Sequence, residues 1–122
     1  MKSNIIIING KIFFYPFILH PLVIDCLIPF STCGVYVLGE KKYDMFIPRY
    51  VGCSFFDLAK RLKSHIGSYS YFCFLLSSNP INAYIYKCDL YHLLGGNLYL
   101  ENKIHPASPN YMNLECPYSL WD

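Results

Sequence analysis

Two β-prone runs joined by a short polar turn constrain the fold of this chain most strongly. Residues 33–40 (CGVYVLGE) and 45–54 (MFIPRYVGCS) are rich in β-branched and aromatic side chains. The residues between them, 41–44 (KKYD), predict a turn, so we expect an antiparallel hairpin. Pro48 has no backbone N–H to donate, and it therefore predicts an edge strand or a bulge in the returning strand.

A helix is expected directly after the hairpin. Ser54 with Asp57 three residues later is similar to a capping box, so the helix is expected to begin at Ser54. The body FFDLAKRLKSHI places apolar side chains on one face, namely Leu58, Leu62 and Ile66. The neighbouring row of positions four apart holds Asp57, Arg61 and His65.

A third strand and a second helix complete the predicted order. Residues 71–78 (YFCFLLSS) are almost continuously apolar, which favours a central strand. Asn79 followed by Pro80 predicts a helix start, and Gly95-Gly96 predicts a stop after residues 82–94. The sequence therefore predicts an α+β fold with a small, mainly antiparallel three-stranded sheet flanked by helices.

The N-terminal part is expected to be an apolar arm of one domain that spans residues 1–122. Residues 12–30 are strongly apolar, but Pro, His and Asp side chains interrupt them, which argues against a membrane span. We therefore expect residues 1–32 to be extended and packed on the domain. The hydrophobic fraction of 54% and charged fraction of 15% exclude a disordered chain.

The six cysteines are scattered and form no CxxC pair, so a zinc site lacks its usual spacing. Most lie in apolar runs, where a free thiol behaves as a small hydrophobe. We expect them to be reduced and the protein to be intracellular and cytoplasmic. Their even number leaves disulfides open.

Tyr36 and Tyr50 lie on successive predicted strands, within the triplets Gly34-Val35-Tyr36 and Tyr50-Val51-Gly52. In a chain with 12 tyrosines, ordinary cross-strand packing explains such a pair equally well. Arg61 can stabilise negative charge on a phosphate, and His65 can transfer a proton near neutral pH. A solvent-exposed Asp57–Arg61 pair is the structural alternative.

Together these elements resemble the GIY-YIG nuclease family. The resemblance extends from about residue 15 to 118 and includes further elements in the family's order. These are Phe72, Ala83, residues 88–92 (CDLYH), residues 102–109 (NKIHPASP) and Cys116-Pro117. Small stand-alone members of the family end in a similar NKIHPAxP segment. The resemblance implies a GIY-YIG-like fold and hydrolysis of DNA phosphodiesters with one divalent metal, Mg²⁺ or Mn²⁺.

The resemblance also implies residue roles. Tyr36 would activate the attacking water as general base together with His65, and Tyr50 would position the water or the phosphate. Arg61 would neutralise charge in the transition state. Asn102 would orient neighbouring groups on the far side of the cleft. Lys60 and Lys63 are local cations that can contact phosphate, so we expect substrate binding by Lys60, Lys63 and Asn102.

Residue 87 departs from the family pattern. The family has a metal-binding Glu there, whereas this chain has Lys87, which cannot ligate a metal ion while it is protonated. Glu101 is the only candidate for a substitute ligand at the level of sequence. Lys87 is consistent with a misaligned surface residue, an inactive variant, or an ammonium that replaces the metal beside the phosphate. Whether the chain is an enzyme is therefore left open.

Two functions from different classes follow. The first is a GIY-YIG endonuclease-like protein that binds DNA and whose catalysis is impaired by Lys87. Its net charge of +2 gives no general affinity for DNA, so binding depends on local groups such as Lys60, Arg61 and Lys63. The alternative is a non-catalytic module that binds nucleic acid or, through its apolar arm, a protein partner. No membrane partner is expected, and the sequence does not fix the oligomeric state.

Overall fold

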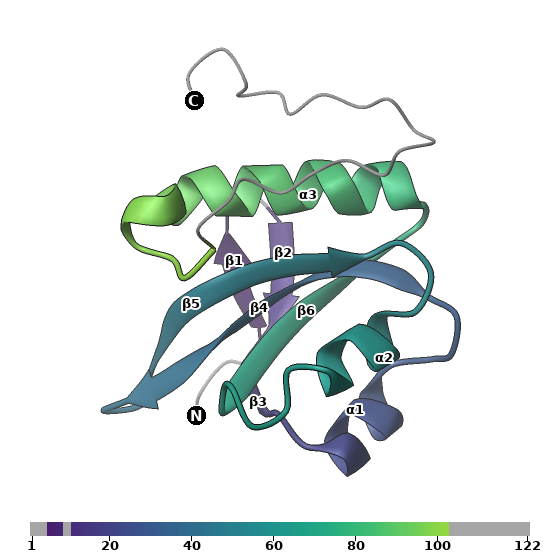
Figure 1. Cartoon of the computed structure of the whole chain (residues 1–122), viewed down its shortest axis with the longest axis horizontal. Helices are drawn as coiled ribbons and strands as arrows, with labels where there is room; N and C mark the ends of the chain where they lie inside the picture. The colour runs from purple at the N-terminus through teal and green to yellow at the C-terminus, as the bar shows by residue number, and fades with distance from the viewer. Residues whose placement is uncertain (1–4, 9–10, 103–122) are drawn as a thin grey trace.

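The computed structural model describes residues 5–8 and 11–102, with side chains from residue 15 onward. It has an α+β architecture (Figure 1). The main sheet is antiparallel with the order β3-β6-β4-β5, formed by β3 (Phe17–Ile18), β6 (Tyr71–Ser77), β4 (Cys33–Lys42) and β5 (Met45–Ser54). A separate hairpin pairs β1 (Ile5–Ile8) with β2 (Lys11–Phe14). The helices are α1 (Pro21–Leu27), α2 (Leu58–Lys63) and α3 (Pro80–Leu93), followed by a 3₁₀ turn, η1 (Gly96–Leu98).

The main sheet has a helical layer on each face (Figure 1). Side chains alternate across a strand, and β4 is buried on both sides because its two sets of residues enter two cores. Val35 and Val37 pack in a core with residues of α3, whereas Tyr36 and Leu38 pack in a core with residues of α1 and α2. Tyr36 therefore lies on the face of the sheet that α1 and α2 cover.

The predicted hairpin of β4 and β5 is confirmed, with a tighter turn than expected. The strands extend to Lys42 and Met45, which leaves Tyr43 and Asp44 as the turn, with φ values of 52° and 65°. Two successive positive φ angles are typical of a two-residue hairpin turn. The register shifts between Leu38 and Gly39, beside Pro48, so the predicted bulge on this edge strand is also confirmed.

The third predicted strand corresponds to β6, which lies between β3 and β4 as expected for a central strand. The prediction of a three-stranded sheet is incomplete, because the structure adds β3 as a fourth strand. Phe17 pairs with Phe72 and Ile18 with Tyr71. Two residues are too few to give a strand pattern in the sequence, and only the pairing with β6 identifies them.

The expectation of an extended N-terminal arm is wrong for residues 21–27, which form α1. His20 is the N-cap, and its Nδ1 accepts a hydrogen bond from the backbone N–H of Leu22 at 3.1 Å. Pro21 occupies the first helical turn, where its missing N–H costs nothing. This proline, which the sequence alone suggests as an interruption, begins the helix instead. Across the described part of the chain, no helix has the length and apolar character needed to cross a bilayer.

Helix α3 begins as predicted, with the side chain of Asn79 accepting a hydrogen bond from the N–H of Asn82 at 2.8 Å. Helix α2 begins later than predicted. Asp57 is its N-cap and accepts from the N–H of Lys60, while Ser54 Oγ accepts from the N–H of Asp57. The two side-chain hydrogen bonds thus form a turn at residues 54–57 and an N-cap at Asp57, in place of the predicted capping box.

Gly52 makes room for the ring of Tyr36. The two residues are cross-strand partners in the β4–β5 ladder, and Tyr36 is only 1% exposed. A Cβ atom at position 52 would overlap Cζ and the hydroxyl oxygen of Tyr36. The tyrosine ring therefore lies across the glycine, and this close approach sets the position of its hydroxyl group.

Gly52→Ala is expected to lower the free energy of unfolding by about 1–3 kcal/mol, because the added methyl group overpacks a buried ring. Chemical denaturation of the full chain measures this cost. In a Tyr36→Leu background, where the ring is absent, the same substitution should cost much less. An equal cost in both backgrounds would show that the contact with Tyr36 is not its cause.

Candidate functional site

A direct hydrogen bond joins Tyr36 on β4 to His65 after α2. The hydroxyl oxygen of Tyr36 lies 2.9 Å from Nε2 of His65. The hydroxyl donates when the imidazole is protonated on Nδ1, and it accepts when the proton is on Nε2. These two residues are 29 positions apart, so the fold has brought together two groups that can exchange a proton.

Two more tyrosines surround the same imidazole. The ring centroid of Tyr50 lies 5.2 Å from that of His65, and the centroid of Tyr69 lies 6.3 Å from it. Tyr69 donates a hydrogen bond of 2.6 Å from its hydroxyl to Oε1 of Glu101. The predicted trio of Tyr36, Tyr50 and His65 is therefore a cluster, with Tyr69 and Glu101 at its border.

Burial favours the uncharged forms of both Tyr36 and His65, and Arg61 adds to this effect only at His65. Burial lowers the pKa of His65, and the positive charge of Arg61 lowers it further. Burial raises the pKa of Tyr36, as does neighbouring Tyr50, while Arg61 opposes this rise. Near neutral pH the pair is therefore a phenol beside a neutral imidazole, and the imidazole is the better proton acceptor.

His65 reaches this position from a turn, not from the helix. We predicted Arg61 and His65 on one helical stripe, but α2 ends at Lys63 and the backbone N–H of His65 donates to the carbonyl of Leu62. The i, i+4 relation is therefore not the cause of their proximity. The apolar stripe also ends early, since Leu58 and Leu62 are fully buried but Ile66 is 39% exposed.

Lys87 of α3 lies in the same electrostatic environment as Arg61. Burial lowers the pKa of Lys87, and Arg61 lowers it further. Burial raises the pKa of the Cys53 thiol, and both Lys87 and Arg61 act against this rise. Both cations therefore act on the same thiol, that of Cys53 near the end of edge strand β5. Lys87 is half-buried, which is against a misaligned surface residue.

Asn102 binds the edge of β5. Its Oδ1 accepts from the N–H of Val51 at 2.8 Å, and its Nδ2 donates to the carbonyl of Val51 at 2.7 Å. The N–H of Glu101 donates to the carbonyl of Arg49. Residues 101 and 102 therefore fix the strand on either side of Tyr50. Substrate binding by Asn102 remains a prediction, and the rest of the NKIHPAxP segment and Cys116-Pro117 lie outside the described residues.

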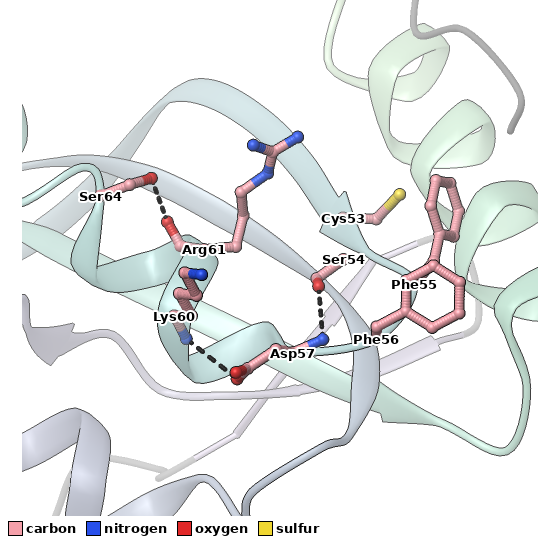
Figure 2. A pocket seen from close by; sticks show the side chains of 8 residues that line it. All are labelled: Cys53, Ser54, Phe55, Phe56, Asp57, Lys60, Arg61 and Ser64. Carbon is pink, nitrogen blue, oxygen red and sulfur yellow. Dashed lines mark hydrogen bonds between the residues drawn. The ribbon is translucent and has the colours of Figure 1, made fainter.

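The predicted substrate-binding lysines separate. Lys60 lines a pocket of about 340 Å³ together with Cys53, Ser54, Phe55, Phe56, Asp57, Arg61 and Ser64 (Figure 2). Lys63 lies elsewhere, because its ammonium pairs with the carboxylate of Asp25 at 2.6 Å and links α2 to α1. Of the two, Lys60 is the one that shares a surface with Arg61.

Lys87 and its surroundings do not fit a divalent metal ion. A protonated ammonium offers no lone pair and repels a cation, and Arg61 adds a second positive charge. Glu101, the predicted substitute, accepts the hydroxyl proton of Tyr69 in a hydrogen bond. Between residues 15 and 102 no cluster of three or more His, Cys, Asp or Glu side chains is arranged to hold a metal ion.

Sequence reasoning missed Tyr69, Cys53, Phe55, Phe56 and Ser64. Tyr69 was one of 12 tyrosines, and nothing in the sequence distinguished it. Cys53 comes from the end of β5, Phe55 and Phe56 from the loop before α2, and Ser64 from the C-cap of α2. A correct start for α2 would have exposed this loop as a separate element.

No family model, curated protein or solved structure matches this chain.

The pKa of His65 tests the electrostatics of the site. We expect NMR titration to give a midpoint below the ordinary value of about 6.5, with the signal assigned by its loss in His65→Gln. The neutral ring contributes stability that is complete above the ordinary value of about 6.5. This contribution is lost as the pH falls through the lower midpoint of the folded protein, because the unfolded chain binds the proton more tightly. Arg61→Gln should raise the midpoint, because it removes a neighbouring positive charge.

Lys60→Gln, which removes a cation from the adjacent position of α2, serves as the control and should shift the midpoint less. A midpoint that does not respond to Arg61→Gln would contradict the proximity of Arg61 and His65.

Proposed function

We propose that this protein binds nucleic acid through a GIY-YIG nuclease-like cleft in which metal-dependent hydrolysis of DNA phosphodiesters is impaired by Lys87. The main support is the 2.9 Å hydrogen bond between Tyr36 and His65, with the ring of Tyr50 in tilted contact with the same imidazole. The resemblance predicts that these residues share one site. The α+β fold, with two tyrosines from a hairpin and an arginine from the next helix, agrees with a GIY-YIG-like arrangement.

The proton chemistry of the cleft favours His65 over Tyr36 as the base. Deprotonation of Tyr36 would create a buried phenolate, whereas the neutral ring of His65 can accept a proton near pH 7. Tyr36 would then orient the imidazole or pass a proton from a water molecule to Nε2. This arrangement supplies a general base without any further group.

The cations of the cleft favour phosphodiester binding. Arg61 is exposed, and its guanidinium can make two parallel hydrogen bonds to phosphate oxygens. Lys87, close to Arg61, offers a second positive charge where the family has a carboxylate. A phosphate would be held by two cations, but the divalent ion that the resemblance implies would be repelled.

A protein-binding module is the second candidate. The region around α1 exposes several large apolar side chains, namely Ile18, Leu22, Leu27 and Phe30. Phe30 is 86% exposed and Leu22 is 69% exposed. Large apolar side chains that are exposed next to one another are typical of a protein-binding surface. Helix α1 contacts α2 where Lys63 pairs with Asp25, whereas Lys60 and Arg61 line the pocket of Figure 2. A protein partner on the α1 surface is therefore compatible with nucleic acid binding at the cleft.

A plasmid-nicking assay tests the proposal. With Mg²⁺ or Mn²⁺ at low salt, the unsubstituted chain should show no nicking above background. Lys87→Glu restores a carboxylate beside Arg61 and should produce nicked plasmid. Adding Tyr36→Phe to Lys87→Glu should remove that activity, which controls for a contaminating nuclease.

If the unsubstituted chain nicks plasmid, and Tyr36→Phe abolishes this activity, then Lys87 does not inhibit catalysis as proposed. If Lys87→Glu is folded and binds DNA but does not cut, the cleft lacks more than this one carboxylate. The nuclease-like reading of the site would then be wrong, and a binding module would remain.

A further inference from the structure

The pocket beside Arg61 has an aromatic end and a cationic end. Figure 2 shows Phe55 and Phe56 at one end, and Lys60 and Arg61 of α2 with the C-cap residue Ser64 at the other. Phe56 is 66% exposed, so an aromatic face is accessible from solvent. Phe55 packs against both the core around α3 and the pair Tyr84 and Cys88. One ring is therefore anchored in the protein, and the next one is presented at the surface.

The charged end of the pocket is lined by two cations, Lys60 and Arg61, and by the carboxylate of Asp57. The carboxylate of Asp57 accepts a hydrogen bond from the backbone N–H of Lys60. Ser64 Oγ donates to the carbonyl of Arg61 at 2.6 Å, so it stays close to the helix. The side chains of Lys60 and Arg61 are both exposed at this end. An aromatic surface next to two cations is the composition of sites that bind single-stranded nucleic acid.

We propose that this pocket binds one unpaired nucleotide of a DNA strand, with its base stacked on Phe56 and its phosphate at Arg61 and Lys60. The proposal rests on the proposed function, since Arg61 belongs to both the cleft and the pocket. It adds a substrate class, namely DNA with an unpaired end or strand next to a duplex.

The requirement for an unpaired base follows from the chemistry of stacking. In a duplex both faces of a base are covered by its neighbours, so a paired base has no free face for Phe56. Stacking on an aromatic side chain accepts any of the four bases, because each has a π face. The pocket should therefore select the structure of the DNA and not its sequence. Its volume of about 340 Å³ lies within the range of pockets that enclose small ligands.

Fluorescence anisotropy with the full chain tests this inference. The probes are a blunt duplex, the same duplex with a short unpaired overhang, and dAMP as a free-nucleotide competitor. We expect about fivefold to tenfold tighter binding to the overhang DNA, which corresponds to one stacked base. Phe56→Leu keeps an apolar side chain but removes the π face, and it should reduce the affinity for overhang DNA to that for the blunt duplex.

Phe30→Leu is the matched control, because Phe30 is also a highly exposed phenylalanine but does not line the pocket. It should keep the preference for overhang DNA. Equal binding of both DNAs, or a preference that survives Phe56→Leu, would overturn the inference and leave the proposed function standing. If dAMP displaces the labelled overhang DNA at the same concentration as unlabelled overhang DNA does, the pocket binds a free nucleotide and the inference is overturned. No binding to either DNA would contradict the proposed function itself.

Discussion

The contact between Tyr36 and Gly52 is the constraint on which the site depends. The buried ring of Tyr36 crosses the edge strand at the one residue without a side chain, and its hydroxyl thereby reaches His65. Any larger residue at position 52 would displace the ring. The hairpin also places Tyr50 on the same face, so pairing of β4 with β5 and assembly of the cluster are a single structural event.

The edge position of β5 explains how two helical layers contribute to one site. Arg61 comes from the face that α2 covers and Lys87 from α3 on the other face, and both affect the thiol of Cys53 at the end of the strand. An interior strand would separate these groups by a neighbouring strand. Because β5 is at the edge, Asn102 and the backbone of Glu101 can also satisfy its outward groups at Val51 and Arg49. The same segment protects the edge from pairing with another chain.

Much of the fold was predictable, because local signals and tertiary packing agree there. The hairpin, the central position of β6 and the Asn79-Pro80 helix start follow from β-propensity, apolar continuity and capping. The predictions failed where two local rules competed. Pro21 could interrupt or begin a helix, and Ser54 and Asp57 could share one cap or form two. The later start of α2 separates the loop with Phe55 and Phe56 from the helix, and its end at Lys63 places His65 in a turn.

Of the site, the residue types were predictable, but their geometry was not. Tyr36, Tyr50, Arg61 and His65 were identified from motifs, while the participation of Tyr69 depends on a turn that carries no sequence signal. The sequence also did not distinguish Lys60 from Lys63. Their directions differ because Asp25 of α1 attracts one of them, and α1 itself was not predicted.

The most direct test of the central claim is the salt dependence of affinity for a short duplex DNA, measured for the original chain, Arg61→Gln and Lys42→Gln. Lys42 is an exposed residue near the tip of the β4–β5 hairpin. Lys42→Gln is therefore the control, because it removes one positive charge, as Arg61→Gln does, but at a different place. If Arg61 contacts a phosphate, Arg61→Gln should weaken binding and reduce the slope of log K against log salt by about one, while Lys42→Gln leaves the slope unchanged. Equal slopes for the two variants, or no salt-dependent binding of DNA, would contradict a phosphate-binding cleft at Tyr36, His65 and Arg61.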